Sequence, residues 1–297
     1  MNFPQRKAID FSDGRVSFLE WKSHEGAPTI VFAHANGFNA NTYRSILSPL
    51  AERFRILALD LRGHGMTQLP THPSMVAGWT VYRDDLLRFL HGVGGDRVLL
   101  AGHSLGATSM LMTAAARPHS VRAIVLVEPV IPTNALVMRA VIARFLNRED
   151  SMLPLVAPAK RRRASFATQE DALSAFRGRG GFKTWPRDDL IVDYIQGGTV
   201  SKDGGILLTC APSWEAANFK VYPFDLAKIG RHVDVPLTVL HADRGSSVPT
   251  KMLDQLARAH GNARVVRVEG TTHFLPMEKP DVVRAQIIAT AERAGLL

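Results

Sequence analysis

Short apolar runs alternate with helix-like segments along most of the chain, and this alternation constrains the fold more than any other feature. The strand-like runs are residues 29–33, 56–59, 98–101, 123–127, 237–240 and 263–268, preceded by an alternating polar and apolar stretch at 15–21. The helix-like segments are residues 42–53, 80–92, 105–117, 250–260 and 280–294. Nearly continuous apolar runs of this length are typical of strands buried on both faces of a parallel sheet. The pattern therefore predicts an α/β fold with a mainly parallel central sheet flanked by helices.

The alternation stops after Pro129 and resumes near residue 235. The intervening residues, 130–234, are helix-rich, basic and irregular, with glycines at many points. We see no internal repeat, and 297 residues allow one large domain. We therefore expect one core in two parts, residues 1–129 and 235–297, interrupted by an insertion at residues 130–234.

The net positive charge is typical of proteins that bind nucleic acid, but the rest of the sequence lacks the motifs of such proteins. The chain has 36 Lys and Arg against 27 Asp and Glu, a formal net charge of +9. Much of the excess lies between Arg139 and Arg187, and the tightest basic run is residues 160–163. Zinc-finger spacing, an RNP-type aromatic pattern and a long basic arm are all missing from the sequence. We interpret the basic run as a solvated helix face and expect no nucleic-acid partner.

Cysteine usage and hydropathy indicate the cellular environment. Cys210 is the single cysteine, so no intrachain disulfide can form, which fits a reducing compartment. The first ten residues carry Arg6, Lys7 and Asp10 and no apolar stretch, so we expect no signal peptide. The uncharged residues 98–116 include glycines, hydroxyls and a histidine, so we interpret them as a strand followed by a helix. We expect a cytoplasmic protein without a membrane span, and the sequence indicates no oligomeric state.

The strongest local motif is Gly102-His103-Ser104-Leu105-Gly106. It follows a predicted strand and opens an Ala-rich predicted helix, the context in which G-x-S-x-G forms a nucleophile elbow. The sharp turn holds the serine at strained backbone angles, and larger side chains at the two glycines would collide with the neighbouring strand and helix. The motif predicts that Ser104 is a catalytic nucleophile.

At this point the chain resembles the α/β-hydrolase superfamily, in particular its serine esterase and lipase-like members, over roughly residues 15–130 and 235–295. In that family the nucleophile, the acid and the histidine follow one another in that order along the chain. The resemblance implies that His273, in the loop EGTTHFLPME, is the histidine. Asp243 follows the strand-like LTVL, where the family usually carries its acid, although Pro249 comes later than the usual proline. Glu128, at the end of AIVLV, is the alternative acid, and we prefer Asp243.

The resemblance also implies an oxyanion hole. One donor would be the backbone N–H of Leu105, the residue after the nucleophile. The other would be the N–H of Asn36 in the loop AHANGF. The Asn36 side chain resembles the asparagine that holds halide in haloalkane dehalogenases, but those enzymes use an aspartate nucleophile. With Ser104 as the nucleophile, dehalogenation and epoxide hydrolysis are both disfavoured.

In this family an insertion after the sixth strand commonly forms a lid, so residues 130–234 are expected to form a helical cap over the nucleophile. Candidate apolar walls of the cap are Met138, Phe145, Phe176, Trp185 and Trp214. The other candidate substrate-binding residues are Phe38, His103 and Phe274, although His103 is also expected to serve in packing or hydrogen bonding. Basic residues of the insertion, namely Arg162, Arg163, Arg177 and Arg179, could attract an anionic substrate or an acidic partner.

The motifs and the family resemblance together predict a serine hydrolase. It would cleave a small-molecule carboxylic ester or related acyl bond through an acyl-Ser104 intermediate. The alternatives that keep the fold are acyl transfer, carbon–carbon bond hydrolysis and cofactor-free oxidation. A hydrolase-fold ligand receptor is the alternative from another class. We expect no cofactor, because there is no dinucleotide or P-loop fingerprint. We expect no metal, because Asp60 and His64 make a poor ligand set.

Overall fold

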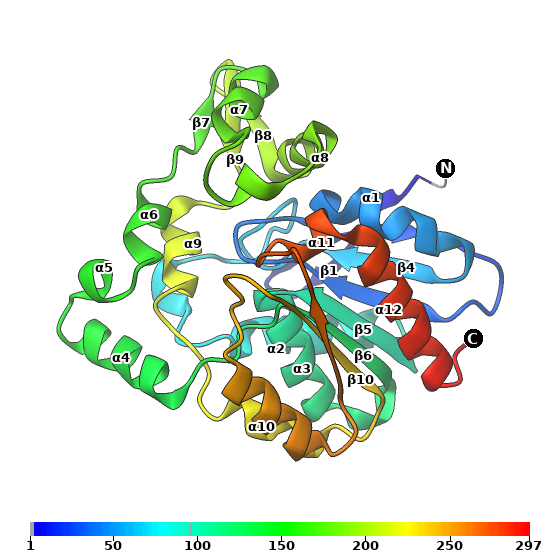
Figure 1. Ribbon diagram of the computed structural model, residues 1–297. Helices are drawn as coiled ribbons and strands as arrows, with labels where there is room; N and C mark the ends of the chain where they lie inside the picture. The colour runs from blue at the N-terminus through cyan, green and yellow to red at the C-terminus, as the bar shows by residue number, and fades with distance from the viewer. Residues whose placement is uncertain (1–2, 96) are drawn as a thin grey trace.

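A central eight-stranded sheet organises the computed structural model, which describes residues 3–95 and 97–297 (Figure 1). The strands are β1 (Gln5–Phe11), β2 (Gly14–Trp21), β3 (Thr29–Ala33), β4 (Arg55–Leu59), β5 (Val98–His103), β6 (Val121–Val127), β10 (Leu237–Ala242) and β11 (Arg264–Val268). Their order across the sheet is β1-β2-β4-β3-β5-β6-β10-β11. β1 and β2 pair antiparallel, as do β2 and β4, and every later pair is parallel. The mainly parallel α/β fold predicted from the sequence is confirmed.

Helices cover both faces of this sheet, which explains why its inner strands are apolar at nearly every position. On one face lie α2 (Thr80–Gly92), α3 (Leu105–Ala116) and α10 (Thr250–His260), and on the other α1 (Arg44–Leu47), α11 (Leu275–Glu278) and α12 (Pro280–Arg293) (Figure 1). Short 3₁₀ helices η1 (Ala40–Tyr43), η2 (Ser48–Glu52), η3 (Pro73–Met75) and η4 (Pro118–Ser120) complete this part of the chain. In β3, Val31 and Ala33 pack with α2 and α3, whereas Ile30 and Phe32 pack with α1 and α12. Each buried strand therefore supplies two separate hydrophobic cores.

Residues 130–234 follow β6 and contain both helices and a small sheet. The helices are α4 (Asn134–Phe145), α5 (Glu149–Met152), α6 (Val156–Lys160), α7 (Gln169–Phe176), η5 (Gly180–Thr184), α8 (Asp188–Gly198), α9 (Pro212–Asn218) and η6 (Leu226–His232). The strands β7 (Ser165–Phe166), β8 (Thr199–Lys202) and β9 (Gly205–Leu208) form an antiparallel sheet in the order β7-β9-β8. The segment was expected to be helix-rich, and the structure adds this small sheet to its helices. Asp203 and Gly204 both have positive φ and join β8 to β9, so this Asp-Gly pair was the available sequence signal for a hairpin.

The parallel strands place their carboxyl ends along one edge of the sheet. The loops that follow β3, β5, β6 and β10 begin at residues 34, 104, 128 and 243. Residues far apart in the sequence therefore meet at this edge, which is where open α/β sheets bind ligands. Among the described helices, none is both long enough and apolar enough to cross a membrane.

Candidate active site

Ser104 occupies a sharp turn between β5 and α3. Its backbone has φ 55° and ψ −121°, a conformation that L-residues rarely adopt. The Ser104 N–H donates to the carbonyl of Val127 at 3.0 Å, and the Ser104 carbonyl accepts from the Thr108 N–H at 3.0 Å. The neighbouring strand β6, through Val127, and the helix α3, through Thr108, thus hold the strained turn in place.

The two glycines of the motif are required by space. A Cβ built on Gly102 would lie 2.8 Å from the backbone N of Ala107. A Cβ on Gly106 would lie 2.3 Å from the backbone O of Ala33. Both obstacles are backbone atoms, so neither can move aside as a flexible side chain could. The steric reason that the sequence suggested for small residues on both sides of Ser104 is therefore present in the structure.

His273 lies between Ser104 and an acidic side chain. Its Nε2 is 3.0 Å from Ser104 Oγ, and its Nδ1 is 3.0 Å from Glu128 Oε2. A carboxylate can only accept a hydrogen bond, so Nδ1 carries the proton and donates it to Glu128. Nε2 is then free to accept the Ser104 hydroxyl proton. The three side chains have the geometry of a nucleophile, a base and an orienting acid.

The Glu128 carboxylate is buried and surrounded by donors. Oε1 accepts from the Ala242 N–H at 2.6 Å and from the Ser246 hydroxyl at 2.8 Å, and Oε2 accepts from the Ser247 N–H at 2.9 Å. Burial alone would raise the pKa of Glu128, but the bond and charge of His273 and the backbone donors outweigh it and lower the pKa to about 2. Glu128 therefore faces His273 as an anion at neutral pH.

The preference for Asp243 as the partner of His273 does not match the structure, which places Glu128 there. Asp243 Oδ1 accepts instead from the Thr271 N–H at 3.0 Å, and backbone hydrogen bonds from Gly270 and Thr271 lower the pKa of Asp243. Asp243 thus holds the first residues of the loop that carries His273. The physical reason is that both acids follow neighbouring parallel strands, β6 and β10, and only Glu128 reaches the imidazole.

The loop after β3 is held by hydrogen bonds on both sides of Asn36. The Ala35 N–H donates to the Tyr43 hydroxyl at 3.2 Å, and the Gly37 N–H donates to His64 Nε2 at 2.9 Å. The role of His64 in supporting this loop had no sequence signal beyond its place in a glycine-rich turn.

The backbone N–H groups of Asn36 and Leu105 are the two expected oxyanion donors. Within the described ranges, the backbone N–H groups of Asn36 and Leu105 have no hydrogen-bond partner in the protein. Leu105 is the first residue of α3, where backbone N–H groups lack partners inside the helix. Both groups are therefore available to an external acceptor beside Ser104.

The Asn36 side chain, which resembles the halide-binding asparagine of haloalkane dehalogenases, forms hydrogen bonds with α9. Its Nδ2 donates to the Glu215 carbonyl at 3.0 Å, and its Oδ1 accepts from Asn218 Nδ2 at 3.0 Å. The Glu215 carboxylate in turn accepts from Arg162 Nη1 at 2.8 Å. A side chain bonded in this way ties the loop to residues 130–234, and sequence reasoning missed this tie because its partners are about 180 residues apart.

His103 was expected among the substrate-binding residues, and the structure buries it completely behind the site. Its Nε2 lies 2.8 Å from the His273 carbonyl oxygen and must donate to it, while Nδ1 lies 2.7 Å from the Tyr43 hydroxyl. Burial, reinforced by the charge of His273, lowers the pKa of His103 to about 3, so it stays neutral. His103 therefore fixes the backbone of His273, and Tyr43 links it to the loop after β3.

A cavity of about 540 Å³ lies over Ser104 and His273. Both parts of the chain line it. The core contributes Ala35, Asn36, Phe38, Ser104, His273 and Phe274, and residues 130–234 contribute Leu155, Pro158, Ala159, Arg162, Phe176, Arg179, Gly180, Gly181, Phe182, Glu215 and Phe219. Most of these side chains are apolar, as in typical small-molecule sites. The structure thus brings Phe38, Phe274 and Phe176 into the cavity wall, as the sequence predicted.

The other candidate wall residues lie elsewhere. Met138 and Phe145 are exposed on α4 and do not line this cavity. Trp214 is buried, and its Nε1 donates to the Arg62 carbonyl at 3.1 Å. Trp185 packs behind the wall, with its ring centroid 5.6 Å from that of Phe38, and its Nε1 has no partner among the described residues. Helical spacing and apolar character did not distinguish these packing and surface positions from the cavity wall.

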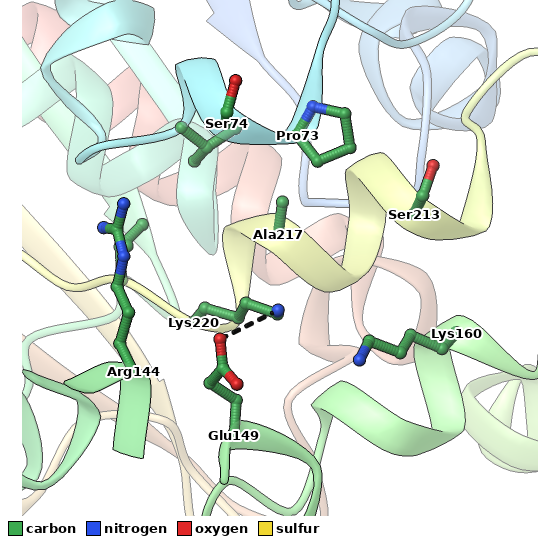
Figure 2. Close-up of a pocket in the computed structure, with 10 residues that line it drawn as sticks. Pro73, Ser74, Arg144, Glu149, Lys160, Ser213, Ala217 and Lys220 are labelled. Atoms are coloured by element: carbon green, nitrogen blue, oxygen red, sulfur yellow. Dashed lines mark hydrogen bonds and ion pairs between the residues drawn. The ribbon is translucent and has the colours of Figure 1, made fainter. Parts of the chain in front are cut away.

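A second cavity, of about 390 Å³, lies next to α6 and α9 without reaching Ser104 or His273. Its charged lining consists of Arg144, Lys160, Lys220 and Glu149 (Figure 2). Lys220 Nζ is 3.0 Å from Glu149 Oε1, and Lys160 Nζ lies 2.6 Å from a carboxylate oxygen of Asp150. Ser74 lines this cavity and its Oγ lies 2.7 Å from His72 Nδ1, but both residues are exposed. The cavity over Ser104 is the candidate reaction site, because there the histidine also contacts a buried carboxylate.

Comparisons with known proteins agree with this fold. The model of the Alpha/beta hydrolase family matches residues 30–286. A 2-(acetamidomethylene)succinate hydrolase from Mesorhizobium japonicum is 24% identical over 273 residues, which cover 91% of this chain and 89% of that protein. The crystal structure of E-2-(acetamidomethylene)succinate hydrolase superposes with a TM-score of 0.77 at 22% identity, covering 98% of this chain and 99% of that chain. The thioesterase domain from the curacin biosynthetic pathway also has a TM-score of 0.77, at 20% identity, over 97% and 100% of the two chains. At these identities the solved structures support the fold alone.

Proposed function

The chain belongs to the alpha/beta hydrolase family, and we propose that it is a serine hydrolase that cleaves a carboxylic ester or a related acyl bond. The observation that carries this proposal is the pair of 3.0 Å contacts of His273, one to Ser104 Oγ and one to Glu128 Oε2. The relative from Mesorhizobium japonicum is named for hydrolysing an acetamido compound, so amides belong beside esters in the proposed substrate class.

The first half of the proposed reaction forms an acyl-enzyme. His273 Nε2 takes the hydroxyl proton of Ser104 as Oγ attacks the carbonyl carbon of the substrate. The anionic Glu128 stabilises the imidazolium formed on His273. Collapse of the tetrahedral intermediate breaks the bond to the leaving group, which departs as an alcohol or amine with the proton from His273.

The second half regenerates the serine. Water attacks the acyl carbon while His273 removes its proton, and the acid product leaves as that proton returns to Ser104 Oγ. In both halves the developing oxyanion would accept hydrogen bonds from the N–H groups of Leu105 and Asn36. Their lack of partners within the described residues supports this role.

We also propose that residues 130–234 serve as the lid of the site. They supply more than half of the residues that line the cavity over Ser104, and most of these are apolar. Such a cover excludes water and provides the acyl pocket. Phe38, Phe176, Phe182 and Phe274 are the proposed contacts for the acyl chain, with Trp185 supporting Phe38 from behind.

Covalent labelling tests the proposed nucleophile. A fluorophosphonate should label the protein, and the label should be lost in Ser104→Ala. Ser109→Ala is the matched control, because Ser109 lies one turn along α3 with its hydroxyl bonded to the Leu105 carbonyl at 2.8 Å. A panel of acyl esters of increasing chain length should then be hydrolysed by the parent protein and by Ser109→Ala, but not by Ser104→Ala.

Other outcomes separate this proposal from its rivals. Folded protein that takes no label and hydrolyses no ester would contradict the proposal and favour a ligand receptor. Label that persists in Ser104→Ala would place the nucleophile elsewhere. Product analysis with added alcohols or amines would distinguish acyl transfer from hydrolysis at the same serine.

A further inference from the structure

We propose that the catalytic cavity takes acyl substrates that carry a carboxylate away from the scissile bond, and that Arg179 binds this carboxylate. The inference rests on the proposed function, because it names the substrate class of the same site. Residues 139–187 carry an excess of positive charge, and only a cation without a carboxylate partner is free to bind an anionic ligand.

Several of the cations between Arg139 and Arg187 already have a carboxylate partner inside residues 130–234. Arg163 pairs with Asp171, Arg177 with Asp188, Arg187 with Asp189, and Lys160 with Asp150. These exposed pairs contribute little stability, but each one satisfies the charge of its arginine or lysine. The concentration of basic residues in the sequence therefore overstates the positive charge available to a substrate.

Within the cavity wall itself, the charged side chains are Arg162, Arg179 and Glu215. Arg162 is largely buried and donates to the Glu215 carboxylate and to the Tyr194 hydroxyl. Arg162 and Glu215 thus neutralise each other. Arg179 is the remaining charge, and no carboxylate in the described part of the chain pairs with it.

The position of Arg179 suits a role in binding. It is exposed in the loop between α7 and η5, flanked by Gly178 and Gly180, both of which have positive φ. Nothing lies within 4 Å of a Cβ built on either glycine, so the surroundings of the loop are open. The rest of the wall is mainly apolar, with Phe176 and Phe182 on either side of this loop in the sequence.

A lone guanidinium in an apolar wall selects for an anion. Its planar donors match a carboxylate in a two-bond arrangement. A neutral substrate of the same size would leave that charge without a partner. The wall therefore favours an acyl chain that is apolar along its length and anionic at its far end.

Half-esters of straight-chain dicarboxylic acids, each compared with its diester, test this specificity. We expect the parent protein to hydrolyse half-esters of matching length with a higher kcat/KM than the diesters, and the preference to fall with added salt. Arg179→Gln should lower kcat/KM for the half-esters by about 2- to 5-fold, the value of one exposed ion pair, and should leave the diesters nearly unchanged.

Two control variants locate the effect. Arg177→Gln removes a neighbouring cation that is already paired with Asp188. Arg144→Gln removes a cation from the separate cavity of Figure 2. Neither should change the ratio of half-ester to diester turnover. If Arg144→Gln removes the preference and Arg179→Gln does not, the anion binds in the other cavity and the proposal is overturned.

A binding measurement keeps the inference separate from the proposed chemistry. Ser104→Ala should bind a half-ester more tightly than its diester by calorimetry, and adding Arg179→Gln should remove the difference. Equal hydrolysis and equal binding of both esters would overturn the role of Arg179 while leaving the serine hydrolase proposal intact. Selective half-ester binding without any hydrolysis would support Arg179 and contradict the proposed reaction.

Discussion

Replacing Glu128 by glutamine tests which acid serves His273. Glutamine keeps the size of the side chain but removes its charge and turns one oxygen into an NH₂ donor. Around Glu128, the Ala242 and Ser247 N–H groups and His273 Nδ1 all present donors to the two oxygens. An amide can accept on one side only, so at least one of these donors would face another donor.

The expected loss follows from the charge that the site is built to hold. The pKa of Glu128 falls from 4.5 to about 2 despite burial, which corresponds to about 3 kcal/mol of stabilisation of the anion. Loss of the anion also removes stabilisation of the imidazolium and favours the wrong tautomer of His273. In a serine triad the equivalent change lowers kcat by about 10⁴-fold, or roughly 5 kcal/mol.

Steady-state kinetics on the best ester of the panel would measure this effect. Asp243→Asn is the matched comparison, since its amide oxygen can still accept the Thr271 N–H, and we expect it to lose less than about 10-fold in kcat/KM. Circular dichroism and thermal unfolding of both variants would show that each remains folded. If Asp243→Asn loses activity severely and Glu128→Gln retains it, the assignment drawn from the 3.0 Å contact of His273 is refuted.

Three further predictions concern stability and positioning. Gly106→Ala places a Cβ 2.3 Å from the Ala33 carbonyl oxygen, so urea unfolding should show a loss of about 1–3 kcal/mol or more, whereas Gly78→Ala, with no atom nearer than 4.0 Å, should change little. The folded pKa of Glu128 lies below its unfolded value, so its contribution to stability relative to Glu128→Gln should be complete above pH about 5. This contribution should disappear as the pH falls from about 4.5 to about 2. Denaturant titrations across this range would show a contribution that grows as the pH falls if the carboxylate were not held as an anion. Tyr43→Phe removes the hydroxyl that joins Ala35 to His103, which in turn holds the His273 carbonyl. We expect kcat to fall more than KM changes, and an unchanged kcat would rule out this positioning role.

The elements with strong periodicity were predictable because their signal is local. The segments predicted as a strand at 29–33 and as helices at 80–92 and 250–260 have these bounds in the structure. Residues 42–53 were expected to form one helix, but the structure divides them among η1, α1 and η2, with Pro49 inside η2, because proline lacks the N–H that a continuous helix needs. β1 gave no apolar signal because it is an edge strand with mostly exposed side chains.

In the candidate site, too, the residues in local motifs were predictable and the contacts between distant segments were not. Ser104 and His273 lie in motifs of a few residues and were found from the sequence. The choice between Glu128 and Asp243 depended on Ser246 and Ser247, which surround Glu128 only after β6 and β10 pair. The cavity wall was equally hard to predict, because a buried tryptophan such as Trp214 and a cavity-lining phenylalanine have the same apolar pattern in the sequence. Contacts between distant segments therefore determine which acid contacts His273 and which apolar residues line the cavity, and local sequence patterns do not show these contacts.

The bonds between Asn36 and α9 limit how this protein can be rebuilt by recombination. Exchanging all of residues 130–234 for the insertion of another hydrolase would also remove the Glu215 carbonyl and the Asn218 amide that hold Asn36. This protein would then gain a new pocket, but the loop after β3 would lose the hydrogen bonds that hold Asn36. A graft that ends before α9, and leaves residues 212–218 with the core, keeps that support. For such a graft, a boundary before Pro212 preserves the Asn36 contacts, whereas a boundary where the chain returns to the sheet removes them.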